Sequence, residues 1–175
     1  MVSVKRIGIL LCVAGVAASG LVGTDGARAD SGTTCTVENP VNLAPGLSLQ
    51  GSTGTFDNEN RGTVSCDGPV DGVEATGPGT FLDKGIYGTQ DPDDCINGGE
   101  GQGSYTMVLP TANGKKTVVL PFTLTFGAPS TNGGLVGVHT RGDGFVGEFG
   151  AVPTAGDCVS APVTTVLVNG QIVFS

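Results

Sequence analysis

Hydrophobic residues recur at every second position along much of this chain, and this spacing constrains its fold more than any other feature. The clearest example is the segment 118–126, in which Val118, Leu120, Phe122 and Leu124 share one face of an extended strand. No segment beyond the N-terminal apolar run shows a stripe with the 3.6-residue period of a helix. Glycine and proline, which interrupt helices, supply 31 and 10 of the 175 residues. We therefore expect an all-β fold.

Short strand-like runs, many of them bounded by turn residues, continue along the chain. They are 33–37, 47–49, 62–66, 72–75, 81–87, 105–109, 118–126, 135–140, 145–152, 163–168 and 171–174. Tight hairpins are expected at Asn113-Gly114, at Asn169-Gly170 and around 141–144, and a flexible loop is expected at 98–103. This pattern predicts an antiparallel β-barrel or β-sandwich of roughly 8–11 short strands, and we favour the barrel.

Residues 1–29 have the pattern of a secretory signal peptide. A basic pair precedes an apolar run of about twelve residues, and Ala27 and Ala29 suit cleavage before residue 30, with a cut near Ala18 as an alternative. The run is shorter than the roughly 20 residues needed to span a bilayer. We therefore expect a secreted protein without a stable membrane anchor, in which residues 30–175 form one all-β domain.

Removal of the leader would also change the charge of the protein. The leader holds three basic residues and one acidic residue, so the net charge of −8 would become −10. Such a charge repels nucleic acids and anionic membranes, and it suits a soluble exported protein. We expect no nucleic-acid partner.

The cysteines indicate two disulfides. Cys12 lies in the predicted leader, so its removal leaves four of the five cysteines. An even number of cysteines in an exported chain implies disulfide bonding. Three pairings of the remaining four cysteines are possible. Cys35 and Cys66 lie in strand-like runs, whereas Cys95 and Cys158 follow acidic loop residues, so pairing like with like predicts Cys35–Cys66 and Cys95–Cys158. A metal site is not expected from these cysteines, because there is no C-x-x-C pair and only one histidine.

Candidate catalytic and cation-binding patterns are sparse. The single histidine, His139, lies beside a predicted turn, and no G-x-S-x-G motif selects a serine partner. The acidic residues Asp91, Asp93 and Asp94 form a weak candidate for a Ca²⁺ site, since hard cations prefer several oxygens from one turn. They do not follow the EF-hand spacing, and the preferred interpretation is an acidic loop held by a disulfide. We expect no cofactor.

The tripeptide 141–143 reads Arg-Gly-Asp, which allows an adhesion hypothesis. In a chain rich in glycine and aspartate, an ordinary turn is the preferred interpretation.

Three segments carry a resemblance to known proteins. These are 62–72 (GTVSCDGPVDG), 76–80 and 156–164, which together resemble a group of small exported actinobacterial proteins of unassigned activity. The resemblance implies secretion and a β fold, and it supplies no site residues. In composition the chain is also similar to neocarzinostatin-type apoproteins, which are acidic, glycine-rich β-sandwiches with two disulfides that carry a small molecule. Those proteins close short disulfide loops, whereas the nearest cysteine spacings here are 31 and 29 residues.

These observations lead to three hypotheses for function. The first is a secreted, disulfide-stabilised β module without catalytic activity, acting by binding or as an extracellular or envelope component. The second is a carrier of a small apolar ligand, with Phe122, Phe126, Phe145 and Phe149 as possible lining residues. The third is a secreted hydrolase. A cavity large enough for a ligand would favour the second hypothesis.

Overall fold

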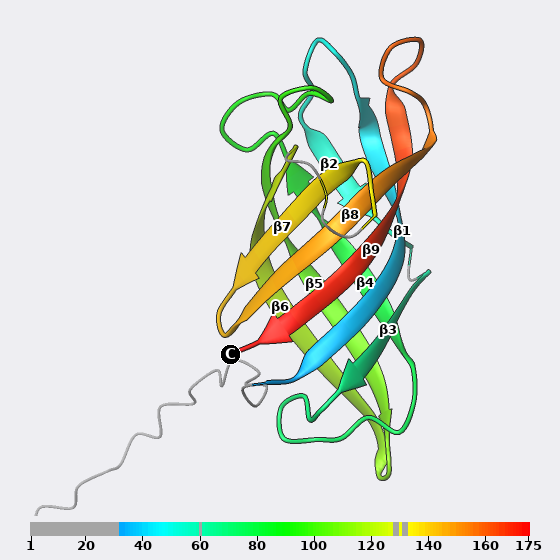
Figure 1. Ribbon diagram of the computed structural model, residues 1–175, viewed down its shortest axis with the longest axis vertical. Coiled ribbons are helices and arrows are strands. Elements are labelled where there is room, and N and C mark those ends of the chain that lie inside the picture. The colour runs from blue at the N-terminus through cyan, green and yellow to red at the C-terminus, as the bar shows by residue number, and fades with distance from the viewer. Residues whose placement is uncertain (1–31, 60, 128–129, 131–132) are drawn as a thin grey trace, which may run out of the picture.

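The computed structural model describes residues 32–59, 61–127, 130 and 133–175 (Figure 1). The predicted leader 1–29 and its cleavage site lie outside the described residues. The described chain is all-β, as predicted. No helix within it is long and apolar enough to cross a membrane.

Nine strands account for the regular structure of the described residues. They are β1 (Thr34–Leu47), β2 (Gly54–Asp57), β3 (Gly62–Asp67), β4 (Gly79–Tyr87), β5 (Gly99–Thr111), β6 (Gly114–Phe126), β7 (Val136–Gly142), β8 (Phe145–Ala155) and β9 (Val163–Phe174). Every pairing between neighbouring strands is antiparallel. The alternation of buried and exposed residues along β6 reproduces the period of two in its sequence.

The strands form a closed barrel, because β1 pairs with β9 along most of its length. On its other side, β1 pairs with β3 near Cys35 and with β2 near Leu43. The same two short strands both pair with β4. Strands β2 and β3 therefore lie end to end between β1 and β4, and together they take one of the eight positions around the barrel. Closure removes the unpaired edges that an open sheet would expose.

The two ends of the barrel differ (Figure 1). The connections 48–53, 88–98 and 156–162 lie at one end, together with Gly127 after β6 and Leu135 before β7, and we call this the loop end. At the other end, which we call the closed end, lie the two-residue hairpin between β7 and β8, the hairpin between β5 and β6, and the C-terminus. This polarity follows from the up-and-down order of the strands from β4 to β9.

Both predicted disulfides are confirmed. Cys35 and Cys66 are direct cross-strand partners on β1 and β3, and they form a bond over a sequence separation of 31. Cys95 and Cys158 join two connections at the loop end, over a separation of 63. One bond therefore fixes a short strand to the barrel wall, and the other ties two loops together.

The predicted hairpin at Asn169-Gly170 is wrong, because both residues lie inside β9. Gly170 pairs with Val37 of β1 and with Phe149 of β8, so the strand is hydrogen-bonded on both sides at this point. A Cβ at Gly170 would lie 2.6 Å from the Cα of Phe149 and 2.8 Å from its Cδ1. The glycine gives room for an aromatic residue on the neighbouring strand instead of making a turn.

The glycine-rich segment 98–103, predicted as a flexible loop, also forms a strand, since β5 begins at Gly99. At the far end of β5 the predicted hairpin is present, but its turn residues are Ala112 and Asn113. Gly114, with a φ of 122°, already pairs with Thr111.

Gly103 on β5 shows why glycine is required inside this barrel. A Cβ at this position would lie 2.5 Å from the carbonyl oxygen of Lys84, 2.9 Å from the Phe122 ring and 3.0 Å from the Phe56 ring. Two aromatic side chains therefore occupy the space that a side chain on Gly103 would need.

We expect Gly103→Ala to lower the free energy of unfolding by about 1–3 kcal/mol, which is the usual cost of adding a methyl group to a packed site. The measurement is urea denaturation followed by fluorescence or circular dichroism. Gly77→Ala is the matched control, because a Cβ there has no atom within 4 Å. Equal stability of the two variants would contradict the packing argument.

Candidate functional site

Side chains fill the closed end of the barrel. Tyr105 of β5 lies near the middle, with its ring centroid 4.1 Å from that of Phe122 and 4.9 Å from that of Phe81. Below this aromatic group the inward-facing side chains are almost completely buried. They include Cys35, Val64, Met107, Leu109, Val118, Leu120, Phe145, Ile172 and Phe174. This half of the interior is an ordinary packed core.

The half of the barrel nearer the loop end is hollow. A cavity of about 260 Å³ extends from Tyr105 and Asp83 to the disulfide Cys95–Cys158. Its wall is mainly aliphatic and aromatic and comes from most strands of the barrel. The wall includes Val41, Leu43, Phe56, Tyr87, Leu124, Val138, Ala151, Val166 and Val168. Its size and apolar lining are typical of small-molecule sites, which barrels often hold at their mouths.

The four phenylalanines proposed as lining residues divide between the two halves. Phe122, Phe126 and Phe149 are on the wall of the cavity. Phe145 instead packs against Phe174 in the closed end, with ring centroids 6.0 Å apart.

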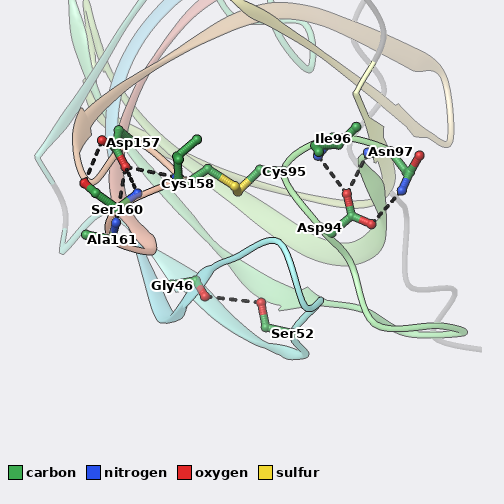
Figure 2. The surroundings of a disulfide bond; sticks show 11 residues. Gly46, Ser52, Asp94, Cys95, Ile96, Asn97, Asp157, Cys158, Ser160 and Ala161 are labelled. Carbon is green, nitrogen blue, oxygen red and sulfur yellow. Dashed lines mark hydrogen bonds between the residues drawn. A yellow bond between two sulfur atoms is a disulfide. The ribbon is translucent and has the colours of Figure 1, made fainter.

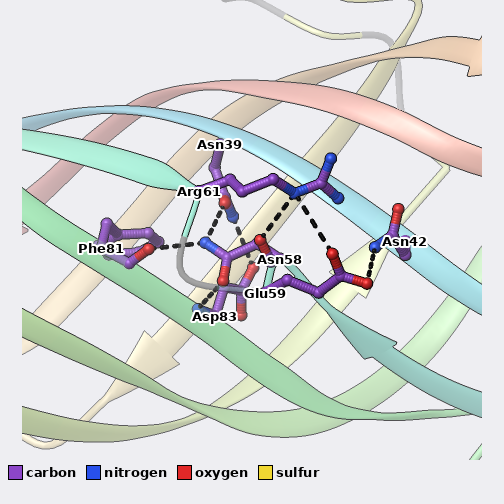
Figure 3. Close-up of polar contacts among 7 residues, drawn as sticks. All are labelled: Asn39, Asn42, Asn58, Glu59, Arg61, Phe81 and Asp83. Atoms are coloured by element: carbon purple, nitrogen blue, oxygen red, sulfur yellow. Dashed lines mark hydrogen bonds and ion pairs between the residues drawn. The ribbon is translucent and has the colours of Figure 1, made fainter.

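A buried polar cluster joins β1, β4 and the segment after β2 (Figure 3). Asn39 of β1 donates from Nδ2 to Asp83 Oδ2 of β4 at 3.0 Å. Asn58, which follows β2, donates from Nδ2 to Asn39 Oδ1 at 2.6 Å. All three side chains are buried, with exposed fractions of 8% or less. Asn39 and Asp83 also line the cavity.

Asn58 completes the barrel wall where β2 ends and before β3 begins. Its Nδ2 donates to the carbonyl oxygen of Phe81 at 2.7 Å, and its Oδ1 accepts from the backbone N–H of Asp83 at 3.2 Å. These are backbone groups of β4 that a continuous strand would satisfy. The side chain of Asn58 therefore bridges β1 and β4 across the interruption, and it satisfies buried groups that would otherwise be costly.

Asp83 is the one member of this cluster with an unused atom. Its Oδ1 is buried and has no hydrogen-bond partner among the described residues. Burial raises the pKa of Asp83 to about 7, and the hydrogen bond from Asn39 partly opposes this shift. The carboxyl group can therefore gain or lose its proton near neutral pH.

Tyr105 and Thr140 place a second polar pair at the same level of the barrel. The Tyr105 hydroxyl donates to Thr140 Oγ1 at 3.2 Å, and both residues are buried. Burial, together with the nearby Asp83, holds the pKa of Tyr105 well above its usual value, so the phenol stays neutral.

The loop end is held by the disulfide and by two aspartates (Figure 2). Asp94 accepts from the backbone N–H groups of Ile96 and Asn97, each at 2.7 Å. Asp157 accepts from the N–H and hydroxyl of Ser160, and its hydrogen bonds lower its pKa to about 2. Both loops are therefore ordered next to the cysteines that join them.

The three aspartates of the weak Ca²⁺ candidate, Asp91, Asp93 and Asp94, line one hollow at the loop end. Asp93 is buried and accepts from the N–H groups of Gly88 and Glu100, while Asp94 serves the turn described above. No group of three potential metal ligands occurs in the described parts of the chain. His139 is exposed on the outer face of β7, and residues 141–143 end β7 and start the turn to β8.

We did not predict the polar cluster from the sequence, although the position of one of its residues could have indicated it. Asp83 alternates with Phe81, Gly85 and Tyr87 in the predicted strand 81–87, so it falls on the inward face of that strand. A carboxylate on an apolar strand face is unusual and points to a buried site. Asn58 had no such signal, because it lies between two short strands.

Comparisons of the chain with protein-family models, with curated proteins and with solved structures give no match.

Proposed function

We propose that this protein binds a small, largely apolar molecule inside the barrel. The observation that carries the proposal is the cavity of about 260 Å³. Aliphatic and aromatic side chains line both halves of the barrel, but they fill only the closed end. The cavity is therefore confined to the half nearer the loop end. The extra polar group at its inner end, Asp83, would orient a ligand that the apolar wall holds.

The proposal is for binding without catalysis. The single histidine lies on the outer face of β7. The described residues lining the cavity include no serine, free cysteine or lysine that could act as a nucleophile, and the hydroxyl of Thr140 is hydrogen-bonded to Tyr105. A hydrolase that forms a covalent intermediate would need such a group near a base. The lining of the cavity therefore supports a carrier or receptor for a small molecule over a hydrolase with a side-chain nucleophile.

We also propose that the protein acts outside the cytoplasm. Two disulfides suit an oxidising compartment, and the N-terminal pattern predicts export. A barrel that protects an apolar molecule from water would be useful there.

The direct test is native mass spectrometry of protein purified from its natural source without denaturation. A reproducible added mass, lost after unfolding and refolding, is expected. Refolded protein should then bind octanol in isothermal titration calorimetry. The absence of both an added mass and octanol binding would overturn the proposal.

We expect Val168→Phe to weaken octanol binding by about tenfold or more, because the added ring enters the cavity and displaces ligand volume. Val168 is buried and lines the cavity. The matched control is Val173→Phe on the same strand, where the side chain points outward and is 40% exposed. Equal loss of binding in the two variants would mean that octanol binds elsewhere.

A further inference from the structure

Asp83 gives the cavity a chemical preference. Its Oδ2 is held by Asn39, and its backbone N–H is held by Asn58, so the carboxyl group has a fixed orientation (Figure 3). Its Oδ1 remains buried without a partner among the described residues. A buried carboxylate oxygen without a donor costs free energy, and a ligand that brings a donor would remove that cost.

The described wall of the cavity supplies no cation for this carboxylate. None of the described residues that line the cavity is basic. Four titratable residues line the described wall, and they are Asp83, Tyr87, Tyr105 and Asp157. The described wall residues of the other strands have no titratable side chain. Burial raises the pKa of both tyrosines, so they stay neutral. An anionic ligand would meet Asp83 with no compensating positive charge.

The charged residues around the entrance also favour a cationic ligand over an anionic one. The described connections at the loop end, 48–53, 88–98 and 156–162, contain Asp91, Asp93, Asp94 and Asp157, but no lysine, arginine or histidine. The basic residues of the described chain lie on the strands, on the hairpin of the closed end and beside the interruption after β2. They are Arg61, Lys84, Lys115, Lys116 and Arg141. A negative potential at the entrance raises the local concentration of cations and lowers that of anions.

We infer that the ligand is a lipophilic amine, whose apolar part lies along the cavity wall and whose ammonium N–H groups donate to the carboxylate of Asp83. This inference rests on the proposed binding function. In the complex the amine carries the proton and Asp83 is ionised, so the two form a hydrogen-bonded ion pair at the inner end of the cavity. Such charge-assisted bonds are stronger than neutral ones, particularly away from water.

The experiment compares three molecules of the same chain length, octylamine, octanol and octanoate, by isothermal titration calorimetry. At about pH 8, where Asp83 is ionised in the free protein, octylamine is expected to bind about tenfold or more tightly than octanol, and octanoate the most weakly. In Asp83→Asn, octylamine and octanol should bind about equally. Asp57→Asn makes the same chemical change at an exposed position on β2 and should keep the preference.

Wild-type protein provides a second test that needs no substitution. Below about pH 7 the free protein holds a proton on Asp83 that must leave when an ammonium binds, so octylamine affinity should fall by up to about tenfold per pH unit while octanol affinity stays constant. Octanol binding as tight as that of octylamine, or a preference that survives in Asp83→Asn, would overturn the amine assignment and leave the binding site in place. Failure of all three molecules to bind would overturn the proposed function itself.

Discussion

Removal of the Cys35–Cys66 disulfide, in the double variant Cys35→Ala/Cys66→Ala, is expected to lower the free energy of unfolding by about 4 kcal/mol. The loop that this bond closes has a sequence separation of 31, and constraining an unfolded loop of that length accounts for most of the effect. The bond also fixes β3, which has only six residues, to β1. Urea denaturation of oxidised protein gives the free energy.

The disulfide at the loop end provides the comparison. Cys95→Ala/Cys158→Ala removes a bond over a longer separation of 63, and the loop-entropy model predicts a loss of similar or slightly larger size. Cys35 is completely buried, whereas Cys95 and Cys158 are partly exposed. A much larger loss for the first pair would show that packing around Cys35 adds to the entropic term. A loss below about 1 kcal/mol for both pairs would contradict the model.

The fold was predictable to the extent that local patterns decide it. The alternation in 118–126 is strong because β6 has one face against the interior and the other in water. The disulfide pairing followed from local setting, since two cysteines lie on strands and two lie in loops. These features depend on residues close together in the sequence.

Features that depend on neighbouring strands were not predictable in the same way. Gly103 and Gly170 look like loop or turn residues in isolation, but each gives room for aromatic rings from other strands. Strand β2 is short and pairs with two distant segments, so its local sequence does not predict it. The interruption between β2 and β3 is completed by Asn58, whose partners are 19 to 25 residues away.

The candidate site shows the same division. Aromatic residues on the inward face of a strand were identifiable, but the sequence could not decide which of them pack together and which surround empty space. Phe122 lines the cavity, whereas Phe145 lies in the closed end, which side chains from several strands fill. A cavity is a property of how side-chain volumes add up across the barrel, so it has no local signature.

The stability of the barrel is expected to fall by up to about 4 kcal/mol between about pH 4 and about pH 8 because of Asp83. Its pKa in the folded protein is about 7, above the ordinary value of 3.8. Between these values the folded protein holds a proton that the unfolded chain has released. The contribution is therefore fully present below the unfolded pKa, and it is lost as the pH rises through the folded pKa.

Asp83→Asn isolates this contribution from the other titrating groups, some of which act in the opposite direction. The hydrogen bonds of Asp94 and Asp157 lower their pKa values, so these groups favour the folded state at higher pH.

The difference in unfolding free energy between Asp83→Asn and wild type should change by up to about 4 kcal/mol in favour of the variant from about pH 4 to about pH 8. Asp57→Asn makes the same chemical change at an exposed position on β2 and is the control. Parallel pH profiles for wild type and Asp83→Asn would mean that Asp83 titrates normally. A saturating lipophilic amine should reduce the loss in wild type above about pH 7, because its ammonium group would compensate the buried carboxylate.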